Sequence, residues 1–478
     1  MSDPDVIVVG GGVSGLSAAW WLAQAGCSVE IWEQDGRLGG KIATRQADGY
    51  LTERAASMML NFRPEVSQLL AATGLDVGRI ACPSAPQCQR YLVRGGRLVP
   101  VPMRLGALVR SSLWTLGGKL RLLAEPLVPR GGRPDETVSE FVVRRLGREV
   151  LETAMEPFVA GPLASDPDQA SAHAVLPRLV ALERRYGSLV IGASVRRFLR
   201  RGTAPVREMF SFGGGMATLT RALAATAGVR FRARSTALRL EPARSGWRLD
   251  GQTPAGGLTV RARQLVLSVP APAAAALLRP LDVGLGHLLH GIEYSALTVV
   301  HLAFDRSAIR HPLDGLGFLV PRGEGLPLTG CQWMSSTFPS RAPRGKALLT
   351  CYVGGARVPQ ARDWTDGRCI DAAMASLEPL LGIEAAPERV WIDRHTSGLP
   401  LYHGAYAGRL RAMSERLRSW PGLHLAANYW GGVSVRDRIA CGHATASRVH
   451  TSLARSRLSA SVTGLDSPPV PAVPRSLG

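Results

Sequence analysis

The sequence lacks a long hydrophobic run. No uninterrupted apolar stretch in its 478 residues reaches the roughly 18 that a membrane-spanning helix needs. Its first residues, Met1 to Asp5, also lack the basic and apolar regions of a signal peptide. These absences exclude an integral membrane helix and predict a cytoplasmic protein. A chain of this length exceeds what one core usually supports, so two or three domains are expected.

Cysteine and lysine are scarce. The seven cysteines are odd in number and contain no C-x-x-C pair: Cys27, Cys82, Cys88, Cys331, Cys351, Cys369 and Cys441. We therefore expect reduced, mostly structural thiols and no metal site. Only Lys41, Lys119 and Lys346 are lysines, so arginine supplies nearly all of the net charge of +20.

Half of the excess positive charge lies in one region. Residues 90–207 contain 20 Lys and Arg against 10 Asp and Glu. An anionic membrane surface or a polycarboxylate substrate suits this charge better than nucleic acid, for which the chain has no motif. Within the region, Met103–Leu123 predicts a basic amphipathic helix at a lipid interface, although an ordinary packed surface helix fits the same periodicity.

A glycine fingerprint opens the chain. The apolar run Val6–Val9 predicts a strand, and Gly10, Gly12 and Gly15 follow it in the pattern G-x-G-x-x-G. The first glycine permits a tight turn, the second lets the backbone approach a pyrophosphate, and the third allows close packing of helix on strand. A second predicted strand ends at Glu33, where a carboxylate can accept hydrogen bonds from ribose hydroxyls. The pattern predicts a bound nucleotide cofactor.

The run Arg37-Leu38-Gly39-Gly40-Lys41 extends this fingerprint with cations and a second glycine pair. A nicotinamide site does not need the extension, whereas it resembles flavoproteins with the amine oxidase type of FAD domain. Near the other end, residues 422–435 predict a strand and a glycine turn that lead into a helix. Its N-terminal amides would face the flavin, where negative charge develops on reduction.

The rest of the chain alternates between recognisable segments. Strand and helix signals alternate through residues 6–74, and a basic helical section follows them. A helix is predicted near 216–227 and five strands between 229 and 269. Strand-like runs from 298 to about 395 predict a mainly antiparallel sheet, a natural platform for substrate.

Beyond the fingerprint, the chain resembles the oxygen-dependent, FAD-containing protoporphyrinogen oxidase family from about Val6 to Ala446. Glu156–Gly161 is similar to that family's helical domain, and Ser335–Pro343 and Leu348–Arg357 are similar to its substrate-domain core. The resemblance implies an α/β fold: a Rossmann-like FAD-binding domain of the amine oxidase type, a substrate domain with a mixed or antiparallel sheet, and a mainly helical membrane-associating domain.

The implied domains are discontinuous. They are an FAD-binding domain (1–85, 208–270 and 420–455), a helical membrane-associating domain (90–200), a substrate-binding domain (86–102 and 271–419) and a disordered tail (456–478). The implied FAD contacts are Gly10, Gly11, Gly12, Val13, Ser14, Gly15, Glu33, Arg37, Gly39, Gly40, Lys41, Ala55, Ala56, Ser57, Met58, Ala237, Asn428, Val433, Ser434 and Val435. Arg90 matches the arginine that pairs with a substrate propionate, and Arg104 and Arg110 are weaker anchor candidates.

The implied reaction converts protoporphyrinogen IX to protoporphyrin IX in heme biosynthesis. Hydride transfer to FAD is repeated three times, with dioxygen as acceptor and release of hydrogen peroxide. Because the cofactor carries this chemistry, no catalytic side chain is named, and His301 and His395 are expected to be structural. The implied partners are a porphyrinogen, dioxygen and the anionic inner face of the cell membrane, to which the protein would bind peripherally. Nucleic acid is not expected, and a homodimer stays open.

Departures from the family pattern leave the substrate open. Ala55-Ala56 replaces a loop that is usually Gly-Pro, and Arg436 and Arg438 stand where Pro or Asn and Cys are common. One alternative is a coproporphyrinogen III oxidase, whose substrate has four propionates. A second is a flavin-binding or porphyrin-binding partner protein without turnover. An amine oxidase is less favoured, because those enzymes usually place a lysine near the flavin and only Lys346 lies near the predicted substrate sheet.

Overall fold

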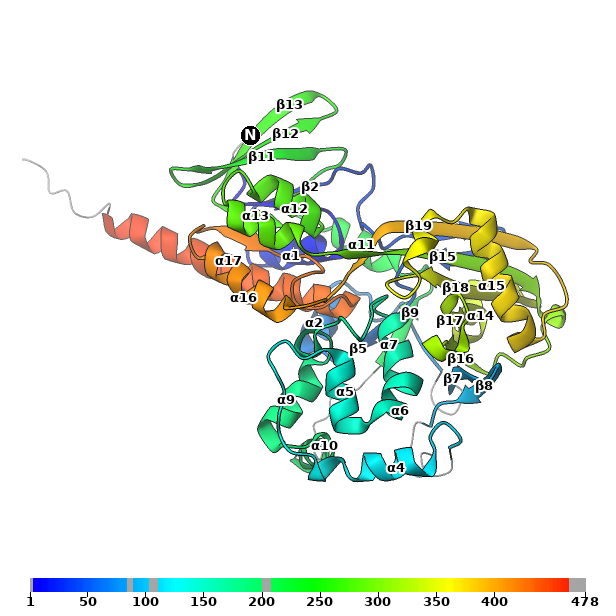
Figure 1. The fold of residues 1–478 in the computed structure, drawn as a ribbon. Helices are drawn as coiled ribbons and strands as arrows, with labels where there is room; N and C mark the ends of the chain where they lie inside the picture. The colour runs from blue at the N-terminus through cyan, green and yellow to red at the C-terminus, as the bar shows by residue number, and fades with distance from the viewer. Residues whose placement is uncertain (1–2, 84–88, 103–110, 200–207, 464–478) are drawn as a thin grey trace, which may run out of the picture.

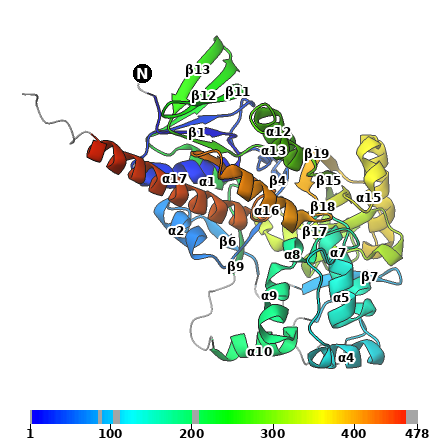
Figure 2. The ribbon, with the colours of Figure 1, turned by 60° about the vertical axis from the view of Figure 1, so that its left-hand side comes forward.

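The computed structural model describes residues 3–83, 89–102, 111–199 and 208–463. Figure 1 shows a layered α/β region, a second sheet to its right covered by one long helix, and a helical region below them. The two ends of the described chain meet in the α/β region, where α1 (Val13–Gln24) and α17 (Val435–Thr463) lie side by side (Figures 1 and 2).

The α/β region is built on a five-stranded parallel sheet in the order β10-β2-β1-β14-β20. Its strands are β1 (Val6–Val9), β2 (Val29–Trp32), β10 (Val229–Arg232), β14 (Gln264–Leu267) and β20 (Leu423–Leu425). Val6 and Val8 pack into the core that contains α1 and α17, and Ile7 and Val9 pack into the core on the opposite face. A parallel strand covered on both faces has no solvent-facing position, which explains the unbroken apolar run.

A small antiparallel sheet and two helices cover the second face. They are β11 (Thr236–Ala243), β12 (Gly246–Thr253), β13 (Gly256–Ala262), α12 (Ala271–Leu278) and α13 (Val283–His290). Together with β10 and β14, these strands confirm the five predicted between 229 and 269. Smaller elements complete the region: β3 (Thr44–Ala47), β4 (Tyr50–Glu53), β5 (Met59–Asn61), β6 (Arg79–Ala81), β9 (Glu208–Phe212), α2 (Pro64–Ala72), α11 (Ala217–Ala224) and α16 (Tyr406–Leu417).

The second sheet has seven strands in the order β19-β15-β18-β17-β16-β7-β8. They are β7 (Gln89–Arg94), β8 (Arg97–Pro100), β15 (Tyr294–Asp305), β16 (Gly315–Leu319), β17 (Leu328–Trp333), β18 (Lys346–Gly354) and β19 (Arg389–Pro400). Every neighbouring pair is antiparallel except β16 with β7, so the predicted mainly antiparallel sheet is confirmed. Helix α15 (Asp366–Leu381) packs against one face through Cys369, Ala373 and Leu377. The opposite face meets the α/β region around Tyr50.

The helical region has its own core, to which Phe141, Val142 and Val159 contribute. Its helices are α4 (Leu116–Leu123), α5 (Val138–Leu146), α6 (Arg148–Val150), α7 (Glu156–Ala160), α8 (Ala172–Val175), α9 (Pro177–Tyr186) and α10 (Leu189–Leu199). A fully buried ion pair joins Arg145 of α5 to Glu125. Burial would raise the pKa of Glu125, but bonds from the Ser188 hydroxyl and the Leu189 and Val190 amides outweigh it and lower the pKa.

The amphipathic helix expected over Met103–Leu123 is shorter than predicted in its described part, where only Leu116–Leu123 is helical. Residues 103–110, with Arg104 and Arg110, lie outside the described residues, and the helix begins only at Leu116. The Thr115 hydroxyl caps it by accepting the Gly118 amide at 3.1 Å. Leu113 is buried at 1% exposure rather than lipid-facing. In the described part of the chain, no helix is both long and apolar enough to cross a bilayer.

The C-terminal helix is longer than the sequence predicted. Helix α17 continues to Thr463, so the first eight residues of the expected tail, 456–463, are helical. The serines in this stretch are weak helix formers, but the helix already formed on α1 can extend one residue at a time at little cost. Residues 464–478 lie outside the described residues.

We expect Glu125→Ala to destabilise the protein by about 3–5 kcal/mol, because it leaves the guanidinium of Arg145 buried without its carboxylate. The control is Glu152→Ala, which removes an exposed partner of Arg148 and should cost less than about 0.5 kcal/mol. Denaturant unfolding of the two variants measures the difference. Equal losses of unfolding free energy in the two variants would contradict a stabilising role for the buried Glu125–Arg145 pair.

Candidate functional site

The glycine turn between β1 and α1 has the geometry that its sequence predicts. Gly10 adopts a φ of +106°, which a side chain rarely tolerates. A Cβ at Gly15 would lie 2.0 Å from the Gly10 carbonyl oxygen, so only glycine lets α1 approach β1 this closely. A Cβ at Gly12, in contrast, meets no atom within 4 Å. Gly12 is the N-cap of α1, so open space lies beside the amides of Val13 and Ser14, where the helix dipole favours an anion.

Glu33 lies beside this turn at the end of β2. Its two carboxylate oxygens accept the amides of Gly11 at 2.8 Å and Asp35 at 2.9 Å. The amide of Ser235 donates to the Glu33 carbonyl at 2.8 Å, which brings the start of β11 and Ala237 close to the same strand end. Each carboxylate oxygen keeps a second lone pair for another donor. The arrangement can hold a ribose, as the sequence predicted.

Arg37 holds its own loop together. Its guanidinium donates to the carbonyls of Leu38 and Ile42 at 3.1 and 2.9 Å and also to that of Gly40. The Gly39 amide donates to the Gly11 carbonyl at 2.8 Å, so the second glycine pair packs directly on the first. The loop thus braces the fingerprint, and the structure gives Arg37 a loop-holding role.

Lys41 reaches from this loop to the seven-stranded sheet. Its ammonium donates to the Gly398 carbonyl of β19 at 2.6 Å and lies 5.5 Å from the centre of the Tyr294 ring. Burial lowers the pKa of Lys41 to about 8. Lys41 therefore spans the junction between the two sheets and titrates closer to neutral pH than an exposed lysine.

The loop Ala55–Met58 lies at the same junction. The Ser57 hydroxyl donates to Gln332 Oε1 of β17 at 2.8 Å, and the Tyr352 hydroxyl of β18 donates to the same oxygen at 3.0 Å. The Ser57 carbonyl accepts the Ser211 hydroxyl at 2.9 Å. The short side chains of Ala55 and Ala56 leave the loop half-buried between the two sheets.

A buried ion pair fixes that loop, and sequence reasoning missed it. The guanidinium of Arg341 donates to Glu53 Oε1 at 2.9 Å and to the Ser211 hydroxyl at 2.6 Å, and both charged side chains are at most 2% exposed. The other bonds of Glu53 come from Met216 and Thr44 of the α/β region. Burial raises the pKa of Glu53 to about 7, although Arg341 opposes the shift.

The first turn of α17 completes this end of the site. The Ser434 hydroxyl and the Asp437 side chain and amide bond one another, and the guanidinium of Arg63 donates to Asp437 at 2.8 Å. Val433 and Val435 flank the cap. The N-terminus of α17 is thereby held beside α1, as the bond from the Ser17 hydroxyl to the Ile439 carbonyl at 3.2 Å indicates.

Arg90 lies on the sheet face that meets the α/β region. It is paired with Gly317 of β16, which is in turn paired with Gln332 of β17. Directly paired residues on neighbouring strands point to the same face, so Arg90 shares the face of Gln332 and its partner Ser57. Its side chain is exposed and, within the described part of the chain, has no hydrogen-bond or ion-pair partner. It is available to a ligand carboxylate.

His301 and His395 lie on the same sheet face as Arg90, but each imidazole already has a hydrogen-bond partner within the protein. His301 Nδ1 lies 2.9 Å from the Thr350 hydroxyl, and His395 Nε2 lies 2.7 Å from the Arg54 carbonyl. Burial lowers the pKa of both imidazoles. These contacts give both residues a structural role.

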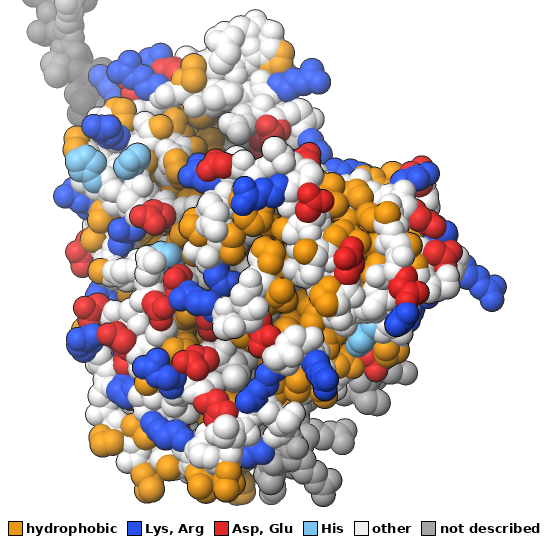
Figure 3. Space-filling model, turned by 45° about the vertical axis from the view of Figure 1, so that its right-hand side comes forward, with side chains coloured by type: hydrophobic (Ala, Val, Ile, Leu, Met, Phe, Trp, Pro, Cys, Tyr) orange, Lys and Arg blue, Asp and Glu red, His pale blue; other side chains and the backbone are white. Residues whose placement is uncertain are grey.

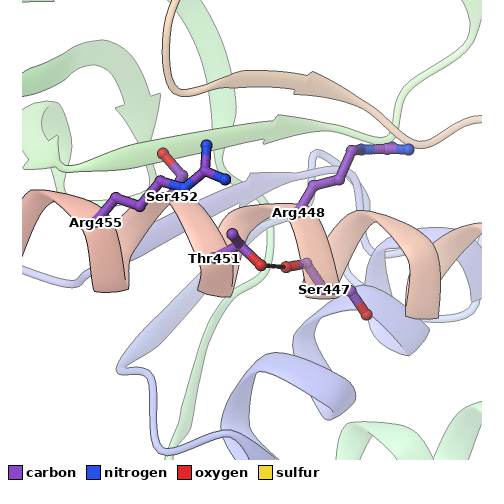
Figure 4. Close-up of a pocket in the computed structure, with 5 residues that line it drawn as sticks. All are labelled: Ser447, Arg448, Thr451, Ser452 and Arg455. Atoms are coloured by element: carbon purple, nitrogen blue, oxygen red, sulfur yellow. Dashed lines mark hydrogen bonds between the residues drawn. The ribbon is translucent and has the colours of Figure 1, made fainter.

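A hollow on the surface of α17 is separate from these residues. It is lined by Ser447, Arg448, Thr451, Ser452 and Arg455, and Figure 4 shows Arg448, Ser452 and Arg455 projecting from one side of the helix. The hollow starts about 18 Å along the helix axis from Val435, at 1.5 Å per residue. It contributes nothing to the site at the first turn.

Comparisons with known proteins match this arrangement. The sequence model of the family described as flavin containing amine oxidoreductase matches residues 13–450. The chain is 31% identical to the mitochondrial protoporphyrinogen oxidase of Nicotiana tabacum, over 91% of this chain and 93% of that protein. It is 28% identical to the coproporphyrinogen III oxidase of Bacillus subtilis, over 94% and 98% of the two chains.

A solved structure agrees with these relatives. A candidate protoporphyrinogen oxidase from Exiguobacterium has a TM-score of 0.78, with 26% identity over 94% of this chain and 99% of that one. The cyclohexylamine oxidase of Brevibacterium oxydans, at 18% identity and a TM-score of 0.68, shares the fold.

We expect Gly15→Ala to destabilise the protein by about 3 kcal/mol or more, because the added methyl group forces α1 away from β1. Gly12→Ala, three residues earlier, adds its methyl group to open space and should change stability by less than about 1 kcal/mol. Thermal unfolding of both variants without added FAD tests the contrast. A large loss in Gly12→Ala would show that the space beside the turn is filled by the protein itself.

Proposed function

The chain belongs to the flavin containing amine oxidoreductase family, and we propose that it oxidises protoporphyrinogen IX to protoporphyrin IX. As a member of that family it is an FAD-dependent oxidoreductase. The observation that carries the substrate is the similarity to protoporphyrinogen oxidases, which runs through the glycine turn, the helical region and the seven-stranded sheet alike.

FAD fits the residues around the glycine turn. The open space at Gly12, the two helix N-termini and the Glu33 carboxylate match a pyrophosphate and a ribose in chemistry. We assign FAD contacts to the residues predicted from the sequence, with Arg37 acting through its loop. They are Gly10, Gly11, Gly12, Val13, Ser14, Gly15, Glu33, Gly39, Gly40, Lys41, Ala55, Ala56, Ser57, Met58, Ala237, Asn428, Val433, Ser434 and Val435.

The protein's part in the reaction is to bind and orient. When bound, FAD supplies the redox chemistry, accepting a hydride with its two electrons from a methylene bridge in each of three turns, with dioxygen taking the electrons to leave as hydrogen peroxide. Arg90 would hold a propionate of the substrate at the sheet face. The pyrrole proton would leave to solvent.

Coproporphyrinogen III is the second candidate substrate. The similarity to the coproporphyrinogen III oxidase of Bacillus subtilis and the excess arginine over residues 90–207 favour it. The experiment is incubation of the FAD-loaded enzyme with each porphyrinogen, followed by porphyrin fluorescence and peroxide release. Faster turnover of protoporphyrinogen IX supports the proposal, faster turnover of coproporphyrinogen III replaces it with the second candidate, and no product from either rejects both.

Arg90→Ala should raise the KM for the preferred porphyrinogen about tenfold, because it removes a charged hydrogen bond to a propionate, and should leave the flavin spectrum unchanged. Arg97→Ala, on the neighbouring strand of the same hairpin, is the matched control and should have little effect. Steady-state kinetics of the two variants test the assignment. An unchanged KM in Arg90→Ala would remove Arg90 from the substrate site.

FAD affinity should fall as the pH rises above about 8, because Lys41 loses its proton there and with it the attraction for the cofactor's phosphates. Bound FAD raises the pKa of Lys41, so binding above pH 8 takes up a proton, and affinity decreases up to tenfold per pH unit. Lys41→Arg stays charged and should show a flat profile. Fluorescence titration of apoprotein with FAD between pH 7 and 10 measures both profiles, and parallel profiles would contradict the contact.

We also propose peripheral attachment to an anionic membrane on the cytoplasmic side, through the lower end of the helical region. There α4, the turn after it and α10 expose large apolar side chains: Leu116, Leu120, Leu123, Leu127, Val190 and Ile191. Figure 3 shows hydrophobic side chains gathered at this end. Lys119 and Arg196 lie on the same two helices, so basic side chains lie near the apolar ones, a combination that suits an interface of acidic lipids.

The double variant Leu120→Asp with Leu123→Asp should weaken binding to vesicles containing phosphatidylglycerol by at least about 100-fold, since each buried leucine contributes roughly 1.5–3 kcal/mol. Leu238→Asp, at an exposed leucine in the α/β region, is the control. Vesicle sedimentation measures the binding, which should also fall as salt increases. Salt-independent binding, equal loss in the control, or self-association of the wild type through this end would count against the membrane proposal.

A further inference from the structure

Four consecutive carbonyls just before α17 are each held by a buried side chain. Arg438 donates to the carbonyls of Ala427 and Trp430, the second at 2.7 Å. The Tyr402 hydroxyl donates to the Asn428 carbonyl at 3.0 Å, and the Tyr406 hydroxyl donates to the Tyr429 carbonyl at 2.8 Å. Every carbonyl from 427 to 430 is therefore fixed from the protein side. A loop held at each carbonyl cannot rotate its peptide planes without breaking a buried bond.

The three donor side chains are buried and come from two segments, the one that follows β19 and the first turn of α17. Tyr406 opens α16, Tyr402 follows β19, and Arg438 lies in the first turn of α17; none is more than 7% exposed. Burial raises the pKa of both tyrosines, so both stay protonated and act as donors. The segment 427–430 is thus a rigid ledge beside the α17 N-terminus.

The side chain of Asn428 is oriented by a fourth donor, Tyr294 of β15. The amide of Ala271 donates to the Tyr294 hydroxyl at 3.0 Å, and that amide has a proton to give and no lone pair to accept with. The Tyr294 oxygen is therefore the acceptor there, and its own proton goes to Asn428 Oδ1, 3.1 Å away. Burial raises the pKa of Tyr294 to about 12, so this proton stays in place at neutral pH.

This proton order fixes which end of the Asn428 amide is free. Because Oδ1 accepts from Tyr294, the side-chain NH₂ group points the other way. Within the described residues that NH₂ group has no hydrogen-bond partner, and Asn428 is half-buried. A donor pair is therefore held in a fixed direction at the junction of the α17 N-terminus and the seven-stranded sheet.

We propose that Tyr294 is a positioning residue which, through Asn428, presents two amide protons to acceptor atoms of bound FAD. The inference rests on the proposed FAD site and concerns no substrate. An amide that could flip would offer its oxygen to FAD in half of the molecules, so the Tyr294 hydroxyl adds both affinity and a single orientation. Arg438, Tyr402 and Tyr406 hold the ledge from which Asn428 projects.

The test is a double-mutant cycle on FAD affinity, measured by fluorescence titration, with thermal stability measured in parallel. Tyr294→Phe keeps the ring and removes the proton, so FAD affinity should fall about tenfold. The FAD affinity of Asn428→Ala should fall at least as far. The double variant should bind FAD no more weakly than Asn428→Ala alone. Tyr294→Phe also leaves the Ala271 amide without its acceptor, and the resulting loss of thermal stability should be the same in the wild type and in Asn428→Ala. A loss of FAD affinity that depends on Asn428, beside a loss of stability that does not, distinguishes a positioning role from a structural one.

Tyr402→Phe is the matched control, because it removes the same chemical group from the backbone of Asn428 rather than from its side chain. It should lower FAD affinity in both backgrounds, independently of the Asn428 side chain. A second variant, Asn428→Asp, keeps an oxygen for Tyr294 and replaces the donor with an acceptor, so its affinity should fall although Tyr294 is intact.

Additive losses in the Tyr294–Asn428 pair, or wild-type affinity in Tyr294→Phe, would overturn the inference. A wild-type protein that takes up no FAD would overturn both this inference and the FAD site. A wild-type protein that binds FAD and oxidises no porphyrinogen would reject the proposed substrate only, and the cycle would still decide the role of Tyr294.

Discussion

The buried ion pair between Glu53 and Arg341 fixes the geometry on which the site depends. Removing two opposite charges from water costs free energy, which close pairing and further hydrogen bonds offset. Here Glu53 accepts hydrogen bonds from the Met216 amide at the start of α11 and from the Thr44 hydroxyl of β3, while Arg341 lies between β17 and β18 of the seven-stranded sheet. Its second bond, to Ser211, continues to the Ser57 carbonyl and so reaches the loop between the sheets. These bonds hold the α/β region and the seven-stranded sheet, which have separate cores, in a fixed position relative to each other.

The site is consequently an interface, with a different kind of rigidity on each side. On the α/β side, backbone atoms at the glycine turn and the two helix N-termini offer amides in fixed directions, which suits an extended, anionic cofactor. On the sheet side, the Arg90 side chain is exposed and, among the described residues, has no hydrogen-bond or ion-pair partner. A preorganised cofactor half and an adaptable substrate half are what a reaction carried by the cofactor requires.

Sequence patterns predicted the parts of this arrangement that local chemistry determines. The apolar run at Val6–Val9, the glycine spacing and the strand ending at Glu33 each follow from backbone geometry within some thirty residues. The helix predicted over 103–123 forms only from Leu116 in its described part, because periodicity cannot tell which leucines face protein: Leu113 is buried, whereas Leu120 is exposed. The Tyr294–Asn428 contact joins residues 134 positions apart, and no local signal marks it. In the sequence, Arg438 was notable only because it departs from the residue that is common in the resembling family. The structure shows that it donates hydrogen bonds to the carbonyls of Ala427 and Trp430.

The order of the strands along the chain carries a consequence for biogenesis. In the seven-stranded sheet, β7 pairs in parallel with β16, which is synthesised more than two hundred residues later. In the same way, β1 is made long before β14, its neighbour, and β20 completes that sheet near the end of the described chain. A nascent chain therefore leaves the ribosome with unpaired strand edges that stay exposed until almost all of it has been translated. Neither sheet can be completed before its last strand, β19 or β20, has been synthesised, so the protein should depend on chaperones that shield such edges.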